Sequence, residues 1–291
     1  MTMIATQPRL LQAADEGAVR ALVIADPVLH CVLDARLQVA RDLNPHQLGG
    51  FLWGLADAPS AGSMAGPLRL RAAAFHGGNL IPVGEDLAAL EAIATQLGRG
   101  GRGCSSIVGS AAAVEVMWPV LNRSWGRARA IRRRQPLLGT DVVGPVRPDP
   151  QVRRVRPAEL EQFLPAAVAM FTEELEVSPI GHDAGTAYRR RVTELIGAGR
   201  ALARFDDRGQ VMFKAEIGVL SPHTAQVQGV WVRPDLRGAG LGTAAMAAVL
   251  RVALTLAPTV SLYVNDFNTA GRRMYQRLGM RQLATLQTVL F

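Results

Sequence analysis

The chain has 291 residues, 49% of them apolar, and a formal net charge of +8. Because a single core rarely grows beyond about 250–300 residues, this length predicts two domains. Cys31 and Cys104 are too few for a disulfide framework, and no apolar run approaches the roughly 18 residues of a membrane span. The first residues also lack the charged and apolar regions of a signal peptide. We therefore expect a cytoplasmic protein with no membrane partner.

The first half of the sequence alternates short apolar runs with amphipathic stretches. These predict strands at residues 68–75, 79–83, 104–108 and 127–138, and helices at 85–97 and 111–122. We interpret residues 1–138 as a smaller N-terminal α/β domain.

Five arginines form a dense run near the end of this half: Arg127, Arg129, Arg132, Arg133 and Arg134. Nucleic-acid-binding surfaces contain such clusters, but no aromatic residues interleave with these arginines, and charge runs usually face water. We interpret the run as a solvated strand edge or a domain interface, and rank a nucleic-acid partner last.

Residues 139–151 are rich in glycine and proline, which disfavour helix and central strand, so they predict a linker. From there to the end, residues 152–291 predict a second domain of the α/β (α+β) class. Its expected elements are strand 152–156, helices 157–171 and 184–197, strands 200–205, 211–219 and 225–232, a helix from 243, strand 261–265, helix 268–279 and strand 285–291.

The most informative motif follows the strand that ends at Val232. It reads Arg237-Gly238-Ala239-Gly240-Leu241-Gly242, and an alanine-rich helix follows at Thr243. The glycines let consecutive backbone N–H groups turn toward one point, and the helix adds its unsatisfied first-turn amides and positive dipole end. The motif therefore predicts a pyrophosphate site; the alternative is that the glycines only bring a helix close to a sheet. We set a Rossmann dinucleotide site aside because residues 233–237 separate these glycines from their strand.

The spacing Arg237-x-x-Gly240-x-Gly242 resembles the coenzyme A signature of the GNAT superfamily of N-acetyltransferases. Val230-Trp231-Val232-Arg233-Pro234 resembles the strand that leads into that signature, and Ser261-Leu262-Tyr263-Val264-Asn265 with Tyr275 is similar to the family's second cofactor motif. The resemblance covers residues 152–291. It implies a mixed, splayed sheet flanked by helices, with coenzyme A in the gap between the strand before the turn and the strand after it.

The resemblance also implies which residues bind the co-substrate, acetyl-CoA, and it implies no metal. Val230 and Val232 would pair their backbone with the pantetheine arm, and Asn265 would touch the coenzyme. The pyrophosphate would be held by the amides of Arg237, Gly238, Ala239, Gly240, Leu241, Gly242 and Thr243.

Transfer to an amine also needs an acid for the leaving thiolate and a base for the amine. The resemblance places Tyr275 beside the thioester sulfur as the acid; a core tyrosine is the alternative. Where many family members have a glutamate base, this sequence has Gln226, and an amide cannot accept a proton. Strand alternation puts Lys214 and Glu216 on one face of the neighbouring strand, so Glu216 is our candidate base. An ordinary solvent-facing salt bridge between the two is the alternative.

The family builds its acceptor wall from the first two helices and their connection. In that segment Glu173 and Glu174 could attract a cationic amine, or could simply be solvated. We predict an acetyl-CoA-dependent N-acetyltransferase that acts on a primary amine of a small molecule or protein, by direct transfer in a ternary complex. A non-catalytic acyl-CoA sensor is the alternative, and a homo-oligomer stays open.

The first half echoes the second without its phosphate turn. Ile107-Val108-Gly109-Ser110 leading to Trp118 and Leu121 resembles Tyr263-Val264-Asn265-Asp266 leading to Tyr275 and Leu278, but no Arg-x-x-Gly-x-Gly lies between residues 83 and 87. We therefore expect a degenerate GNAT-like module or an unrelated α/β domain. Together, the halves resemble actinobacterial GNAT proteins that carry an N-terminal domain of unknown function.

Overall fold

The structure is a computed structural model that describes residues 7–57, 68–181 and 185–291. Its contacts divide the chain into two compact units: a first unit of residues 1–137 with Leu283–Phe291, and a second unit, Leu138–Gln282. The division differs from the predicted domains at the C-terminus, where the last nine residues group with the first unit. Within the described ranges, no helix combines the length and apolarity that a bilayer crossing requires.

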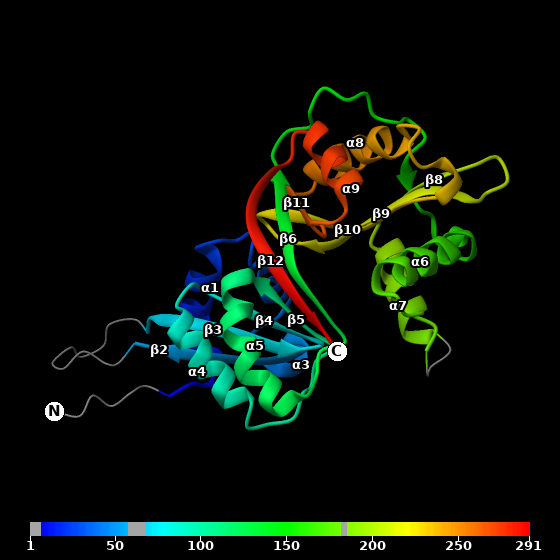
Figure 1. Ribbon diagram of the computed structural model, residues 1–291. Coiled ribbons are helices and arrows are strands. Elements are labelled where there is room, and N and C mark those ends of the chain that lie inside the picture. The colour runs from blue at the N-terminus through cyan, green and yellow to red at the C-terminus, as the bar shows by residue number, and fades with distance from the viewer. Residues whose placement is uncertain (1–6, 58–67, 182–184) are drawn as a thin grey trace, which may run out of the picture. The chain divides into compact units, whose positions relative to one another are not determined.

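The first unit is a sheet with helices on both faces (Figure 1). Its elements are β1 (Arg9–Leu10), α1 (Glu16–Ile24), α2 (Cys31–Val39), α3 (Pro45–Leu48), β2 (Gly50–Ala56), β3 (Leu70–Gly77), β4 (Asn79–Val83), α4 (Leu87–Leu97), β5 (Ser106–Ser110), α5 (Ala111–Trp125) and β6 (Ala130–Thr140). The strand order is β1-β2-β3-β4-β5-β12-β6, in which β12 is Arg281–Leu290. The elements before residue 57 were not predicted, and β6 continues into the predicted linker.

The second unit follows the element order that the sequence predicts. It contains β7 (Arg153–Arg154), α6 (Leu160–Leu175), α7 (Thr186–Gly197), β8 (Ala201–Phe205), β9 (Val211–Leu220), β10 (Thr224–Val232), α8 (Leu241–Leu254), β11 (Thr259–Tyr263) and α9 (Thr269–Arg277). β7 to β10 pair antiparallel in sequence order, whereas β10 and β11 pair parallel. The predicted α/β class, with a mixed sheet flanked by helices, is confirmed.

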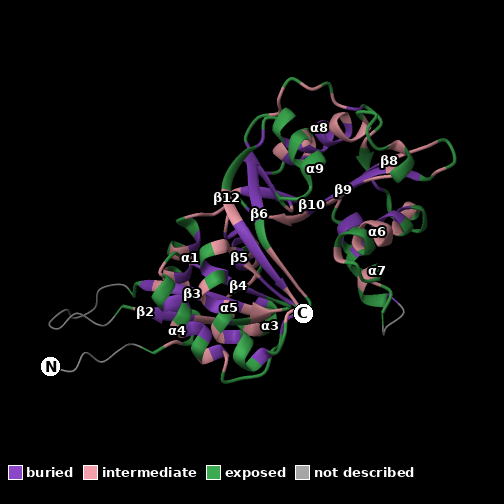
Figure 2. Cartoon of the chain, viewed as in Figure 1, coloured by how far each residue is buried: buried purple, intermediate pink, exposed green. Residues whose placement is uncertain are grey.

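Strand alternation separates two cores in the second unit. Phe213, Ala215 and Ile217 of β9 point toward α8 and α9 and are fully buried there. On the other face of the sheet, α6 and α7 cover a second cluster that includes Phe163 and Trp231. Figure 2 shows the buried residues along the strands and on the helix sides that cover them.

Both halves of the chain repeat one order: a strand, a helical stretch (α1 to α3 in the first half, α6 and α7 in the second), three strands, a helix, a strand, a helix and a final strand. Each final strand contributes to the unit that the other half builds. β12 pairs with β5 of the first unit, from Leu286 opposite Ser110 to Leu290 opposite Ser106. Leu138, near the end of β6, packs in the core of the second unit with Val260. The predicted echo between the halves is therefore a repeat of fold, in which β12 lies mainly in the first unit and the last residues of β6 belong to the second.

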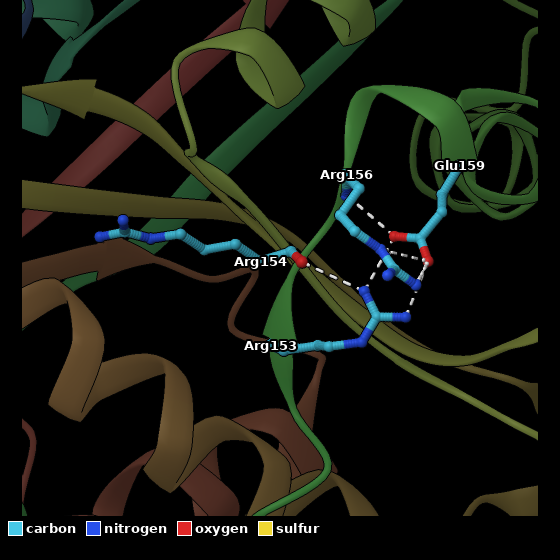
Figure 3. A network of polar contacts seen from close by, with 4 residues as sticks. All are labelled: Arg153, Arg154, Arg156 and Glu159. Carbon is cyan, nitrogen blue, oxygen red and sulfur yellow. Dashed lines mark hydrogen bonds and ion pairs between the residues drawn. The ribbon is translucent and has the colours of Figure 1, made fainter.

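A network of arginines fixes the start of α6 (Figure 3). Glu159 accepts hydrogen bonds from both terminal nitrogens of Arg153, at 2.8 Å each, and from the Arg156 Nη2 at 2.6 Å. The Arg153 guanidinium also lies 4.9 Å from the ring centre of Phe205 on β8. These arginines hold the pKa of the Glu159 carboxyl well below its usual range.

We predict that Glu159→Gln makes the free energy of unfolding less dependent on pH under acidic conditions. Because its pKa is depressed in the folded state, the Glu159 carboxylate contributes fully above its ordinary pKa of about 4.3, and the contribution is lost as the pH falls toward the depressed value. The variant should lose about 1 kcal/mol of unfolding free energy at pH 7, and the gap to wild type should narrow below about pH 4.

Urea unfolding measured across this pH range tests the prediction. Glu161→Gln is the matched control, because Glu161 makes a single exposed pair with Arg189 and should change stability less. An equal loss in the two variants, or a gap that does not depend on pH, would contradict the role of the network.

Candidate functional site

β10 separates from β11 after its first residues. The parallel pairing joins Thr224 to Thr259 and ends with Gln226 opposite Ser261. Where the two strands still pair, the hydroxyls of Thr224 and Ser261 form a buried hydrogen bond of 3.0 Å. Farther along, Gly229 and Val230 oppose a single residue of β9, which is a β-bulge, and Gly229 has a φ of +58°. The sheet therefore splays where the resemblance expects it to.

The turn that follows β10 leaves a row of backbone amides without acceptors. Gly240 is the N-cap of α8 in the left-handed conformation, with φ +83°, and provides no side-chain cap. Within the described residues, the amides of positions 238–242 donate no hydrogen bond, whereas those of Arg237 and Thr243 bond to the turn itself. The seven amides of the prediction thus reduce to five that are free to bind an anion.

The three glycines of the motif have different structural roles. A Cβ at Gly238 or Gly240 would meet nothing within 4 Å, but both residues have a positive φ that other residues rarely adopt. A Cβ at Gly242 would lie 3.1 Å from Val232 Cγ2. Close packing of helix on strand, the alternative explanation of the glycines, therefore applies to Gly242 alone.

The two predicted acceptor-wall acids are in different situations. Glu173 accepts a 3.0 Å hydrogen bond from Trp231 Nε1 through one oxygen and a 2.7 Å bond from Arg237 Nη2 through the other. Arg237 Nε in turn donates to the Val232 carbonyl at 2.9 Å. Glu173 thus joins the end of α6 to β10 and to the turn; both Glu173 and the neighbouring Glu174 are exposed, and Glu174 has interactions of its own. The sequence analysis did not identify Trp231, whose indole N–H donates a hydrogen bond to Glu173.

Lys214 and Glu216 form a buried ion pair on the α6 side of β9. Their side chains are 0% and 4% exposed, with 2.6 Å between Lys214 Nζ and Glu216 Oε1. The second Glu216 oxygen accepts a 3.4 Å hydrogen bond from Gln228 Nε2. Burial lowers the pKa of the Lys214 amine, and the Glu216 charge partly opposes that shift. The pair is therefore not the solvent-facing salt bridge that the sequence left open.

The ion pair lies directly against the bulge of β10. A Cβ at Gly229 would come within 3.1 Å of Lys214 Nζ and 3.4 Å of Glu216 Oε2, and within 3.0 Å of Met170 Cε on α6. Only a glycine leaves this space unfilled. The candidate base is thus next to the stretch of β10 that the resemblance assigns to the pantetheine arm.

Tyr275 lies on α9 in the core beside α8 and is 6% exposed. Burial raises the pKa of its phenol, and the charge of Glu174 adds to the shift. Burial likewise raises the pKa of Tyr188, with a contribution from Glu216, and the Tyr188 hydroxyl donates to the Ala167 carbonyl at 2.9 Å. The Glu174 charge also acts on Lys214, so α6, β9 and α9 bring these groups near one another.

The remaining predicted contacts lie at the end of β11. Asn268 caps α9, since its Oδ1 accepts a 2.9 Å hydrogen bond from the Gly271 amide. Asn265 precedes this cap, and its carbonyl accepts from the Asn268 amide at 3.0 Å. Across the described part of the chain, no three His, Cys, Asp or Glu side chains gather in a way that could hold a metal ion.

In the first unit, side chains fill the helix N-terminus and the region between strands that correspond to this site. Asp86 caps α4 by accepting a 2.9 Å hydrogen bond from the Ala89 amide, and Arg71 donates to the same carboxylate at 2.7 Å. Where β4 and β5 would separate, a Cβ at Gly109 would lie only 2.5 Å from the Pro82 ring. A carboxylate therefore occupies the helix N-terminus and a proline ring fills the gap, which leaves no site for a pyrophosphate or a pantetheine arm.

The sequence of this second unit matches a family model. Residues 157–280 match the acetyltransferase (GNAT) family, and residues 53–163 match a domain of unknown function, DUF4081. Residues 157–280 are a GNAT-family domain. A comparison with curated proteins gave no significant match.

Solved structures with the same fold cover nearly the whole chain. A GCN5-related N-acetyltransferase from Sphaerobacter thermophilus is 15% identical with a TM-score of 0.57, covering 100% of this chain and 97% of its own. An acetyltransferase from Colwellia psychrerythraea is 10% identical with a TM-score of 0.54, covering 98% and 99%. A tandem GNAT protein of the clavulanic acid biosynthesis pathway is 14% identical with a TM-score of 0.53, covering 98% of each chain. The GNAT fold therefore extends to the first unit.

We predict that Lys214→Met destabilises the protein by about 3–5 kcal/mol, because it leaves the Glu216 carboxylate buried without its partner. The double variant Lys214→Met with Glu216→Leu removes both charges and should recover most of that loss. Urea unfolding of wild type, single and double variants measures the difference. If the double variant is no more stable than the single one, the pair is not the buried charge pair described here.

Proposed function

We propose that this protein is a cytoplasmic, acetyl-CoA-dependent N-acetyltransferase that transfers the acetyl group directly to a primary amine. The observation that carries the proposal is the row of five free amides at positions 238–242, at the N-terminus of α8 beside the bulged strand β10. These amides and the helix dipole would hold the pyrophosphate of coenzyme A. Val230 and Val232 would pair their backbone with the pantetheine arm, while their side chains stay against the core.

In the reaction, the amine nitrogen forms a bond to the acetyl carbon, the C–S bond breaks, and the amine loses a proton. Tyr275 would hydrogen-bond to the departing thiolate, and its raised pKa keeps the phenol protonated at neutral pH. Glu216, directly or through water, would take the amine proton. A lysine-like amine needs this base, because its deprotonation at neutral pH costs about 4–5 kcal/mol, against about 1 kcal/mol for an α-amine.

Glu174 is the acid that we assign to the acceptor. It is exposed at the end of α6, and its charge reaches both Tyr275 and Lys214. Glu173 would act indirectly, by fixing the end of α6 and the side chain of Arg237.

A pair of substitutions at Gly240 tests coenzyme binding. Asparagine and aspartate both tolerate the left-handed conformation of this residue, so Gly240→Asn and Gly240→Asp carry a similar backbone cost. Only aspartate places a negative charge at the amides, as Asp86 does in the first unit. Titration calorimetry with acetyl-CoA should give an affinity at least about 10-fold weaker for Gly240→Asp than for Gly240→Asn.

Equal affinities in the two Gly240 variants would show that the pyrophosphate binds elsewhere. No heat from wild type with acetyl-CoA or a longer acyl-CoA would remove the proposal altogether.

Release of free coenzyme A from acetyl-CoA in the presence of pooled primary amines tests catalysis. Tyr275→Phe and Glu216→Gln should each lower turnover by about 10²-fold or more and leave the affinity for acetyl-CoA unchanged. Glu161→Gln, on the outer side of α6, is the control and should keep full turnover. Turnover that survives Glu216→Gln would retire Glu216 as the base.

A second function, an acyl-CoA sensor without catalysis, is favoured by one observation. Glu216 is 3% exposed and already bound to Lys214 and Gln228, and Gln226 occupies the strand position where the family's base would stand. The same assays decide between the two functions: tight binding of acetyl-CoA with no release of coenzyme A across the amine pool identifies a sensor.

A further inference from the structure

The positive charge of the first unit is concentrated in one segment. Residues 99–134 contain eight arginines and one acid, Glu115, for a net charge of +7, whereas the whole chain has +8. The other residues are thus almost balanced. This segment covers the connection from α4 to β5, β5 itself, α5 and the start of β6.

The parts of this segment meet around the ring of Phe291. The Arg102 guanidinium lies 4.3 Å from the centre of that ring, and the Phe291 amide donates to the Ser105 carbonyl at 3.1 Å. The Arg129 amide donates to the Leu290 carbonyl at 2.7 Å, which brings in the start of β6. A Cβ at Gly98 would lie 3.2 Å from Ser124 Oγ, so the ends of α4 and α5 are neighbours.

Most of these arginines have no carboxylate to neutralise them. Within the described residues, six exposed side chains form no ion pair: Arg99, Arg102, Arg123, Arg127, Arg133 and Arg134. The four that belong to the parts meeting around Phe291, namely Arg99, Arg102, Arg123 and Arg127, we call the arginine cluster. Some arginines of the second unit differ: Arg153, Arg204 and Arg233 each have a carboxylate within 2.8 Å. Surface arginines left unpaired in one place are available to an external anion.

Aromatic rings lie among the arginines: Trp118 and Trp125 belong to the segment itself, and His76 and Phe291 come from distant parts of the sequence. Trp118 and Trp125 pack on Phe291 with ring centres 5.7 and 6.3 Å away, and His76 stacks on Trp125 at 5.5 Å. Trp118, Phe291 and His76 are partly exposed. His76 Nε2 and Trp125 Nε1 are buried and have no hydrogen-bond partner in the described structure. The sequence interpretation of the arginine run rested on the absence of rings within residues 127–134, and the fold adds His76 and Phe291 from distant segments to the nearby Trp118 and Trp125.

The connection between α4 and β5 has a composition of its own. It reads Gly98-Arg99-Gly100-Gly101-Arg102-Gly103, and its residues 99–103 are exposed. A Cβ at Gly101 would meet nothing within 4 Å, so the backbone here is accessible. Arginine–glycine segments bind single-stranded nucleic acids, where guanidinium groups contact phosphates and stack on bases.

We propose that this end of the first unit binds single-stranded nucleic acid, with the arginine cluster on the phosphates and the rings of Trp118 and Phe291 against the bases. The rings distinguish this partner from an acidic protein, which would use the charge but not the stacking surfaces. The inference does not depend on the acetyl-CoA site, because it concerns the unit in which that site is closed.

Fluorescence anisotropy of the full-length protein with labelled, mixed-sequence RNA and DNA single strands of about 12 nucleotides tests the proposal at several salt concentrations. Binding should be readily measured at about 50 mM salt and should weaken linearly on a double logarithmic plot. Arg102→Gln with Arg127→Gln should reduce the slope of that plot by about 1.4, at about 0.7 for each lost phosphate contact.

The matched control removes the same charge from the second unit. Arg208 and Arg281 are exposed, and Arg208→Gln with Arg281→Gln should leave the affinity and the salt slope unchanged. Phe291→Leu keeps every charge and should weaken binding by about 5-fold or more without a change of slope, because it removes a stacking surface.

Several results would overturn the proposal. These are no binding at low salt, an equal loss in the two double variants, tighter binding to a duplex than to either single strand, or displacement of the strand by polyglutamate at an equal charge concentration. Tighter binding of either single-stranded RNA or single-stranded DNA supports the proposal and identifies the type of nucleic acid that this surface binds. Failure here, with acetyl-CoA binding intact, would leave the proposed acetyltransferase function in place.

Discussion

The amides at the start of α8 have no acceptors because Gly240 gives the helix no side-chain cap. A helix N-terminus of this kind carries partial positive charge and unsatisfied donors, so it attracts an anion. The first unit repeats the same strand and helix but ends its strand with a short turn to Asp86, whose carboxylate satisfies the helix internally. The cap residue and the turn before it therefore distinguish the free amides of α8 from the capped N-terminus of α4.

The bulge in β10 lies on the strand that leads to these free amides, and it contacts the buried ion pair of Lys214 and Glu216. Gly229 lets the strand turn away from β11, and the absence of a side chain leaves room for Lys214 and Glu216 beneath it. A buried ion pair contributes little net stability, since the desolvation of both charges offsets their attraction. The role that we propose for Glu216 accounts for the position of the pair beside the splayed strand.

Local patterns in the sequence predicted the second unit well. The glycine spacing of residues 238–242 and the alternation of β9 depend on near neighbours, and both identified the elements and faces that the structure contains. The hydrogen bonds that Glu173 accepts could not be predicted from local patterns, because the donors Trp231 and Arg237 lie 58 and 64 residues away in sequence. The helices before residue 57 were missed, and the rings around the arginine cluster come together only through folding.

The pairing of β12 with the first unit has a consequence for how the chain acquires its structure during synthesis. β5 pairs with β12, which is made only after the strands and helices of the second unit, β7 to α9. The first unit therefore has to wait, with an unpaired strand flank, until the second has been made. A ribosome that stalls late would release a polypeptide with an aggregation-prone edge, even though every residue of its N-terminal half is present.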